Sequence, residues 1–230
     1  MEHRFTRTEL VLGQDNLQRL ADTTVAVVGV GGVGGYVAEA LARSGVGTLI
    51  LIDHDVVQLT NLNRQIVALE STIGRPKVEV MAERISDINP ECRVIIHQEY
   101  YEQASQARLL PERVDFVADA IDSVRAKVDL IEYCLKNQVP IISSLGAGNK
   151  LDPTCLEVTD ISKTHTCPLA RAVRGALRKR GISEGVSVVF SREAVVGRRD
   201  GSLPGSTAFV PPVAGLIMAS WIVRQICREV

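Results

Sequence analysis

Residues 24–34 read Thr-Val-Ala-Val-Val-Gly-Val-Gly-Gly-Val-Gly, an apolar run that leads directly into closely spaced glycines. A short β-branched run of this kind is typical of a strand buried on both faces of a parallel sheet. The glycines fit the spacing G-x-G-x-x-G, and the amphipathic pattern of residues 32–44 predicts a following helix. At such a turn the backbone and the helix N-terminus can bind phosphate. The stretch therefore predicts a nucleotide-binding turn, formed by Gly29, Gly31, Gly32 and Gly34.

Strand and helix patterns alternate from residue 20 to residue 150. Strands are predicted at residues 24–30, 48–52, 94–97, 116–118 and 140–143, and helices at 32–44, 77–89, 103–109 and 123–137. This alternation predicts an α/β fold: a Rossmann-like, doubly wound, mostly parallel sheet. After Leu151 the pattern loosens into a helix at 169–180, a strand at 186–190 and a glycine-rich loop at 198–206. We therefore expect one domain, residues 1–230, with a nucleotide-binding core (20–150) and a C-terminal extension (151–230) that serves substrate or dimer contacts.

Charge is balanced over the chain but not along it. The 230 residues carry a net charge of −1 and are 46% hydrophobic, which excludes a disordered chain and a wholly basic nucleic-acid binder. Residues 163–199 hold nine Lys or Arg against two Asp or Glu, a local charge of +7 that leaves −8 elsewhere. Arg171, Arg174 and Arg178 share one face of the predicted helix, and Arg198 and Arg199 follow in the later loop. This face could bind the phosphate backbone of tRNA or could simply be solvated.

The termini and the cysteines indicate the compartment. The N-terminus opens no apolar run, so no signal peptide is predicted. Residues 209–223 are apolar over about fifteen residues, fewer than the roughly 20 that span a membrane, so we expect a buried helix and no stable membrane insertion. The five cysteines include no C-x-x-C pair, which argues against a disulfide framework or a four-thiolate zinc site. A cytoplasmic protein is expected.

Further polar residues follow the predicted strands in order. Asp53 ends the second strand, where a carboxylate can accept hydrogen bonds from ribose hydroxyls. Arginine and lysine can neutralise a triphosphate, and a carboxylate at a strand end can hold Mg²⁺. The candidates for an ATP and Mg²⁺ site are Asp53, Asp55, Asn61, Arg64, Gln65, Lys77 and Asp122. Each has an ordinary alternative, such as a helix N-cap for Asp122, but their order at successive strand ends favours one site.

This ordered set resembles the ThiF/MoeB/HesA family, the ubiquitin-activating-type adenylating enzymes. The resemblance implies that Asp53 binds ribose, that Asn61, Arg64 and Lys77 bind phosphates and that Asp122 holds Mg²⁺. Arg64, Lys77 and Asp122 would thereby act in catalysis. The segment Arg4-Phe5-Thr6-Arg7 is similar to the family's N-terminal arginine motif. In that motif Arg7 would reach the ATP site of the partner in a homodimer.

Other stretches resemble the branch of this family that dehydrates threonylcarbamoyladenosine in tRNA. They include residues 88–94, 119–125 and 190–194. The branch implies that a carboxylate on modified tRNA is adenylated and then closed into a ring. Some members carry a cysteine before the last helix, but residues 205–211 of this chain hold none. An attacking group in the same modification is already tethered, so ring closure needs no enzyme nucleophile. Cys167 is the remaining nucleophile candidate, although a free cysteine more often packs in a core.

Three other functions stay open on the sequence. The first is activation of a ubiquitin-like or sulfur-carrier protein at its C-terminus, against which the missing paired cysteines count. The second is an NAD-binding oxidoreductase, which rests on the glycine turn alone and against which Arg64, Lys77 and Asp122 argue. The third is a non-catalytic scaffold.

Overall fold

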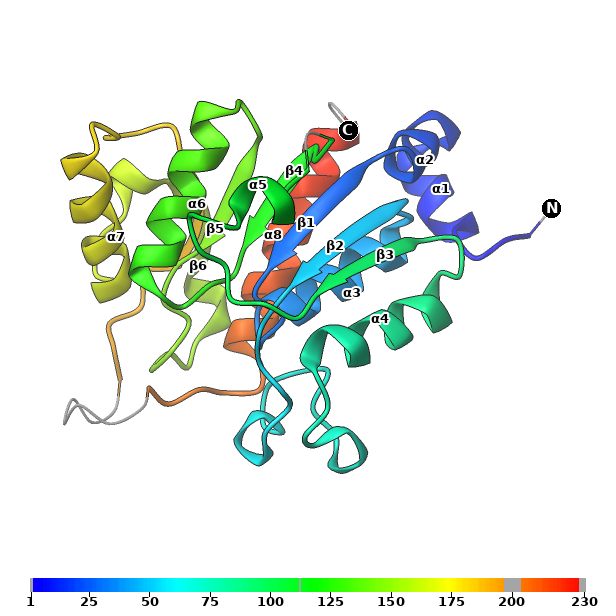
Figure 1. Cartoon of the computed structure of the whole chain (residues 1–230), viewed down its shortest axis with the longest axis horizontal. Helices are drawn as coiled ribbons and strands as arrows, with labels where there is room; N and C mark the ends of the chain where they lie inside the picture. Colours follow the sequence, from blue (N-terminus) through cyan, green and yellow to red (C-terminus); the bar gives the residue numbers. More distant parts are fainter. Residues whose placement is uncertain (1, 112, 197–203, 228–230) are drawn as a thin grey trace.

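A single mixed sheet forms the centre of the computed structural model, which describes residues 2–111, 113–196 and 204–227 (Figure 1). Its strands are β1 (Thr24–Val28), β2 (Thr48–Ile52), β3 (Arg93–His97), β4 (Phe116–Asp119), β5 (Ile141–Ser144), β6 (Leu156–Asp160) and β7 (Ser187–Ser191). The order is β3-β2-β1-β4-β5-β7-β6, and all neighbours are parallel except β6 and β7. The predicted doubly wound, mostly parallel sheet is confirmed, and β6 and β7 extend the same sheet.

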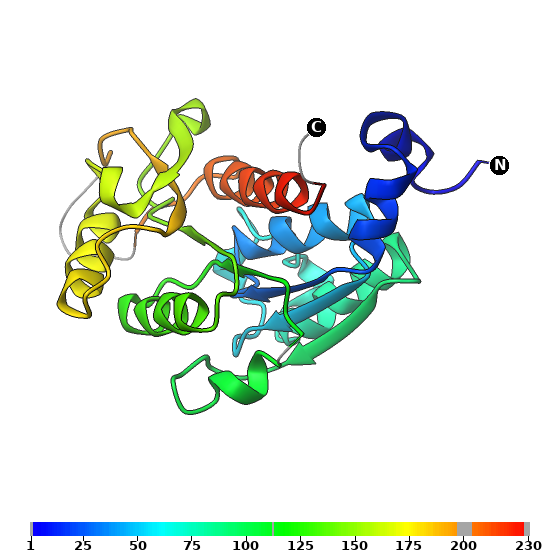
Figure 2. The same cartoon turned by 90° about the horizontal axis from the view of Figure 1, so that it is seen from above.

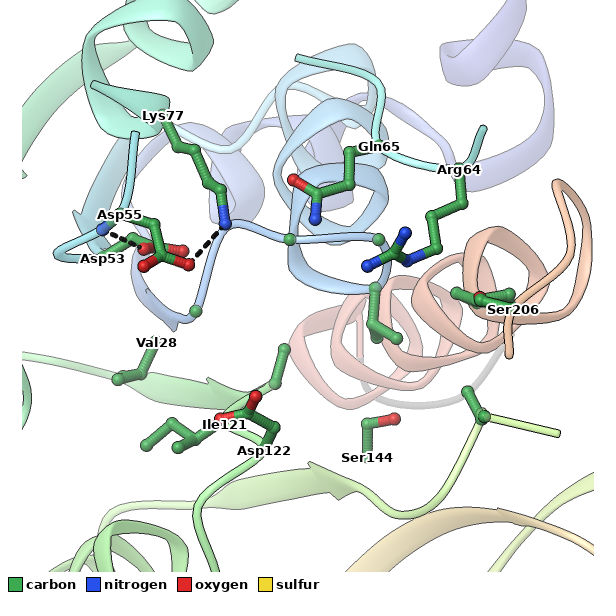
Figure 3. A pocket seen from close by; sticks show the side chains of 18 of the residues that line it. Val28, Asp53, Asp55, Arg64, Gln65, Lys77, Ile121, Asp122, Ser144 and Ser206 are labelled. Carbon is green, nitrogen blue, oxygen red and sulfur yellow. Dashed lines mark hydrogen bonds and ion pairs between the residues drawn. The ribbon is translucent and has the colours of Figure 1, made fainter. Parts of the chain in front are cut away.

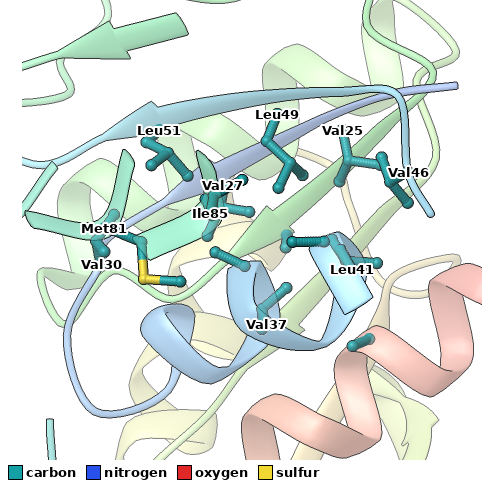
Figure 4. Packing of buried hydrophobic residues seen from close by; sticks show 14 of the residues in the cluster. Val25, Val27, Val30, Val37, Leu41, Val46, Leu49, Leu51, Met81 and Ile85 are labelled. Carbon is teal, nitrogen blue, oxygen red and sulfur yellow. The ribbon is translucent and has the colours of Figure 1, made fainter. Parts of the chain in front are cut away.

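Helices cover both faces of the sheet, as Figure 2 shows. On one face lie α3 (Gly34–Ser44), α4 (Lys77–Ile88) and α8 (Val210–Cys227), and on the other α5 (Gln106–Leu109), α6 (Val124–Lys136) and α7 (Pro168–Lys179). The alternation of side chains along a strand explains this arrangement. Val25 and Val27 of β1 pack in the first core (Figure 4), whereas Ala26 and Val28 pack in the second. The continuous apolar run at residues 24–28 is therefore buried on both sides, as its composition predicts.

The turn after β1 is longer than the sequence predicts. Strand β1 ends at Val28 instead of residue 30, and α3 begins at Gly34 instead of residue 32. The strand ends early because Gly29 has a φ of +89°, a left-handed conformation that residues other than glycine rarely adopt. At the other end of α3, Gly45 adopts φ +94° and caps the helix, which ends at Ser44 as predicted.

Several elements escape sequence analysis. The N-terminal helices α1 (Thr6–Leu12) and α2 (Gln14–Ala21) and the antiparallel edge strand β6 were not predicted. The short 3-10 turns η1 (Leu59–Asn61), η2 (Glu70–Thr72), η3 (Pro153–Cys155) and η4 (Ile161–Lys163) also lie in stretches that carry no periodic pattern. Strand β6 is only partly buried on both faces, so its sequence lacks the apolar signal of the central strands.

The apolar helix near the C-terminus, α8, packs against the sheet. It has 18 residues, more than the roughly fifteen expected, and by length and composition alone it could cross a membrane. However, 56% of this segment is buried inside the protein, and Ala214, Met218 and Ile222 belong to the same core as α3. The expectation of a buried helix is confirmed.

Gly215 of α8 provides a test of this packing. A Cβ at this position would lie 2.4 Å from the carbonyl oxygen of Val33, directly behind the glycine turn. We expect Gly215→Ala to lower the free energy of unfolding by about 2 kcal/mol, because overpacking forces the two helices apart. The control is Gly175→Ala in α7, where a Cβ would meet no atom within 4 Å. This control should raise stability by about 0.5–1 kcal/mol through helix propensity. Equal effects of both variants in urea titrations would contradict the packing described.

Candidate nucleotide-binding site

The glycine turn lies at the carboxyl end of β1 and faces the neighbouring strand β4. A Cβ on Gly29 would lie 2.7 Å from the carbonyl oxygen of Ala120, and one on Gly34 would lie 1.7 Å from the oxygen of Gly29. Both positions therefore require glycine. The backbone at Gly31 and Gly32 borders an open pocket, whereas Gly34 packs inside the turn and does not line it.

Asp53, directly after β2, holds the glycine turn in place. Its carboxylate is 8% exposed and accepts two backbone hydrogen bonds, from the N–H of Val30 at 2.6 Å and from the N–H of Asp55 at 2.8 Å. Each carboxylate oxygen can accept a second hydrogen bond. Asp53 can therefore brace the turn and still accept a hydroxyl from a ligand in the pocket.

Lys77, the first residue of α4, reaches the same end of the pocket. Its side chain is almost fully buried, and its Nζ lies 2.7 Å from Oδ2 of Asp55. Nε2 of His54 lies 3.3 Å from the other oxygen of Asp55, and its ring packs edge-on against Tyr100. Ligand atoms of Asp53, His54 and Asp55 lie within 4.8 Å of one another, so this end of the pocket could also hold a cation.

Arg64, in the segment that follows η1 (Leu59–Asn61), places a second positive charge beside the pocket. Arg64 donates from Nη1 to the carbonyl of Thr60 and to Oδ1 of Asn63, which holds its guanidinium at the pocket wall (Figure 3). Asn61 is buried, and its Oδ1 accepts from the N–H of Gln58 and so shapes η1. This contact gives Asn61 a structural role beside any role in binding.

Gln65 has a buried acceptor oxygen that could bind a ligand. The residue is only 7% exposed, and its Oε1 is the one buried side-chain N or O atom without a hydrogen-bond partner among the residues described. A Cβ on Gly31 would lie 3.7 Å from Nε2 of Gln65, so the amide stands directly over the glycine turn. An unpaired buried oxygen is costly, and a ligand donor or bound water at this point would relieve the cost.

Asp122 faces these groups from the opposite wall (Figure 3). It follows β4, is exposed, and has no hydrogen bond or ion pair with any other residue in the described part of the chain. The helix N-cap, which is the ordinary alternative for Asp122, is supplied instead by Ser123, whose hydroxyl accepts from the N–H of Ala126. Asp122 is therefore available to a ligand or a cation.

The pocket, about 360 Å³ in volume, brings together all but one of the predicted ATP-site residues. Gly29, Gly31, Gly32, Asp53, Asp55, Asn61, Arg64, Gln65, Lys77 and Asp122 line it. Glycine backbone, two cationic groups, the unpaired Oε1 and separate carboxylates fit a nucleoside triphosphate with a divalent cation.

Sequence analysis missed the remaining walls of the pocket. They are formed by residues 99–101 after β3, residues 144–148 at the end of β5, Leu169, residues 204–206 and Pro211. The first two groups follow strands whose ends were predicted, so the sheet edge alone could have indicated them. The segment 204–206 is tied across the pocket by Asn149, which exchanges two hydrogen bonds with Gly205, and by Asn63, which donates to the carbonyl of Ser206.

The predicted Arg7 lies outside this pocket. Arg7 is exposed on α1, and Phe5 beside it packs near Gly45, at the end of α3 remote from the glycine turn. Helix α3 is about 16 Å long at 1.5 Å per residue, so Arg7 does not reach the pocket of its own chain.

The predicted basic face of α7 is only partly free. Arg171 and Arg178 are exposed, but Arg174 is half-buried and donates to the carbonyl of Thr164 at 2.7 Å. Arg180 forms ion pairs with Asp129 and Glu132. Arg198 and Arg199 lie outside the described residues.

The cysteines do not line the pocket. Burial raises the pKa of the Cys92 thiol to about 11 and that of Cys134 to about 12, as expected of core residues. Cys227 is also buried. Cys167 is buried, and its Sγ accepts from the N–H of Ala170 at the start of α7. This contact accounts for Cys167 structurally.

Comparisons with known proteins identify relatives over the whole chain. The model of the ThiF family matches residues 5–229. A tRNA threonylcarbamoyladenosine dehydratase from Bacillus subtilis is 47% identical over all of this chain and 97% of its own length. The crystal structure of the Escherichia coli tRNA N6-threonylcarbamoyladenosine dehydratase in complex with ATP superposes with a TM-score of 0.91 at 42% identity, covering 97% of this chain and 93% of that one. A molybdopterin-synthase adenylyltransferase from E. coli is 35% identical over 65% of this chain and 59% of its own length.

The contribution of the two Asp53 hydrogen bonds to the stability of the glycine turn can be tested without any ligand. We expect Asp53→Ala to lower the free energy of unfolding by about 2–3 kcal/mol, because it leaves the N–H groups of Val30 and Asp55 without their acceptor. Asp53→Asn keeps one acceptor oxygen and should lower the free energy of unfolding by roughly half as much. Asp87→Ala on the exposed face of α4 is the control. Denaturant titration in which Asp53→Ala matched this control would show that the turn does not depend on Asp53.

Proposed function

The chain belongs to the ThiF family, and from this premise we propose that it is an ATP-dependent tRNA threonylcarbamoyladenosine dehydratase. The observation that carries the proposal is the match to dehydratases along the entire chain, together with a pocket whose ATP-site residues converge. The sulfur-carrier type of adenylyltransferase matches a smaller part of the chain. The alternatives of an NAD-dependent oxidoreductase and of a scaffold without activity have no such support.

The reaction removes one water in two steps. A carboxylate oxygen of the modification attacks the α-phosphorus of ATP, and pyrophosphate leaves. A nitrogen or oxygen of the same modification then attacks the activated carbonyl carbon and loses its proton, and AMP leaves with the former carboxylate oxygen. Because the attacking group is tethered to the carbonyl, the second step gains from high effective concentration and uses no enzyme nucleophile.

The pocket residues act by position and charge. We assign the ribose hydroxyls to Asp53, whose oxygens retain free lone pairs. Lys77 and Arg64 stand at two sides of the pocket and would neutralise the charge that develops on the phosphates. Mg²⁺ bound by Asp122 would neutralise phosphate charge further. Gln65 offers its unpaired oxygen to a donor on the ligand or to a bound water.

Two larger contacts complete the proposal. In a homodimer, Arg7 of one protomer would enter the ATP site of the other, since it cannot reach the pocket of its own chain. The exposed arginines of α7, Arg171 and Arg178, would contact the tRNA backbone, with Arg174 holding α7 to Thr164 beneath them. Residues 20–150 would then form the nucleotide-binding core and residues 151–230 the part that serves substrate and dimer contacts. The proposed place of action is the cytoplasm, and no protein carrier is required.

The dehydration itself is the first test. With Mg²⁺, ATP and tRNA that bears threonylcarbamoyladenosine, we expect ATP-dependent loss of one water from that nucleoside, measured by mass spectrometry after digestion. Lys77→Met should reduce the rate by about 100-fold or more, because one preorganised charge at a transferring phosphoryl group is worth roughly this much. Lys136→Met, at an exposed lysine of α6, is the control. An unchanged nucleoside with the wild-type protein would refute the proposed reaction.

The basic face gives a second prediction. Arg171→Glu combined with Arg178→Glu should weaken tRNA binding by about tenfold or more at moderate salt and reduce its salt dependence, because fewer phosphate contacts release fewer counterions. Arg174→Ala should mainly lower the melting temperature, since it loses the bond to Thr164. Lys136→Glu, a single charge reversal on α6, controls for a charge change outside this face. Filter binding at several salt concentrations is the measurement, and unchanged affinity in the double variant would remove α7 from the tRNA interface.

A further inference from the structure

Three polar side chains lie in the core directly beneath the pocket and take no part in the reaction described above. Asp119 ends β4, Lys127 lies in α6 and Ser143 lies in β5, and each residue is 0% exposed. Nζ of Lys127 lies 2.8 Å from Oδ2 of Asp119 and donates to the hydroxyl oxygen of Ser143 at 3.2 Å. The Ser143 hydroxyl donates to the same oxygen of Asp119 at 2.6 Å. The three groups form a closed triad.

Such a triad is hard to explain by stability alone. Removing two charges from water costs about as much as their attraction returns, and apolar side chains of similar volume often serve as well. The core on this face of the sheet, which includes Val117, Leu130 and Ile141, would accommodate apolar residues here. A role in fixing one geometry accounts better for the triad.

The geometry that it fixes is the turn between β4 and α6. Oδ1 of Asp119, the oxygen outside the triad, accepts from the N–H of Ile121 at 3.0 Å. The carbonyl oxygen of Ala120 lies so close to Gly29 that a Cβ at position 29 would be 2.7 Å away from it, so only glycine fits there. One carboxylate therefore sets the turn that both packs on the glycine turn and presents Asp122 to the pocket (Figure 3).

We propose that Asp119, Lys127 and Ser143 are positioning residues of the ATP site: Lys127 and Ser143 orient the Asp119 carboxylate, and Asp119 holds the turn that places Asp122. The inference rests on the proposed role of Asp122 in binding ATP with Mg²⁺. Because Lys127 is fully buried and does not line the pocket, it acts on the nucleotide through Asp119 and the turn.

A double-mutant cycle between Lys127 and Asp122 tests this route. The quantity to measure is the affinity for ATP with Mg²⁺ and the affinity for AMP in EDTA, both by calorimetry without tRNA. Lys127→Met and Asp122→Ala should each weaken binding of ATP with Mg²⁺ by about tenfold, and the double variant should be no weaker than Asp122→Ala within about twofold, because coupled sites are not additive. The affinity for AMP should change by less than about threefold, since the turn is needed for the cation rather than for the base. Lys136→Met, on the exposed face of the same helix, is the matched control.

Removing both charges together should restore binding. In Asp119→Asn the amide oxygen can still accept from the N–H of Ile121, and the amide nitrogen can donate to Ser143. Asp119→Asn combined with Lys127→Met should therefore recover the wild-type affinity for ATP with Mg²⁺ within about threefold. If Lys127→Met fails to fold, Ser143→Ala replaces it in the cycle. That variant retains the ion pair between Lys127 and Asp119. Its affinity for ATP with Mg²⁺ should fall by about threefold, again only when Asp122 is present.

The outcomes separate the two proposals. Losses that multiply in the double variant, or a Lys127→Met protein that binds ATP with Mg²⁺ as wild type does, would overturn the positioning role while leaving the ATP site intact. Wild-type affinity in Asp122→Ala would instead refute the cation role of Asp122 and with it this route. Non-additive losses of affinity, together with recovery of affinity in Asp119→Asn combined with Lys127→Met, would support the positioning role.

Discussion

The two backbone hydrogen bonds accepted by Asp53 are the contacts on which the site depends. The bond from the N–H of Val30 joins the end of β2 to the glycine turn after β1, and the bond from the N–H of Asp55 fixes the carboxylate to its own loop. Together they leave lone pairs on the carboxylate for a ligand. Since Gly29 and Gly34 have no space for a side chain, the turn can adopt this geometry only with glycine. The same residues therefore shape the backbone and form the binding surface, so a change in one alters the other.

The order of strands determines where the other functional groups gather. The chain runs from β1 outward to β2 and β3 and then returns to β4 on the opposite side of β1. Loops after these strands diverge at this point and leave a crevice between them. Asp53, Asp55 and Lys77 enter it from one side and Asp122 from the other, while α8 closes the far side with Pro211. Charges from distant parts of the sequence thus face a single pocket, and in our proposal the buried triad of Asp119, Lys127 and Ser143 supports the turn that carries Asp122.

Much of this arrangement could be predicted from the sequence, because buried parallel strands and their polar ends leave strong local signals. The runs at residues 24–28 and 48–52 and the helix around Leu41 follow from apolar periodicity. Strand β6 could not be found, since its side chains are only half-buried, and α1 and α2 lack a long apolar face. The hydrogen bond of Arg174 to Thr164 and the triad around Lys127 could not be predicted either. They join side chains from different elements, and the pattern within one helix or strand does not record such contacts.

The central step that we propose is the activation of a carboxylate by transfer of AMP to it in this pocket. Labelling the carboxylate oxygens of threonylcarbamoyladenosine in tRNA with heavy oxygen tests this claim most directly. Adenylation followed by ring closure predicts that the released AMP carries one labelled oxygen and that pyrophosphate carries none. Label found in inorganic phosphate or released to water, with unlabelled AMP, would contradict the account.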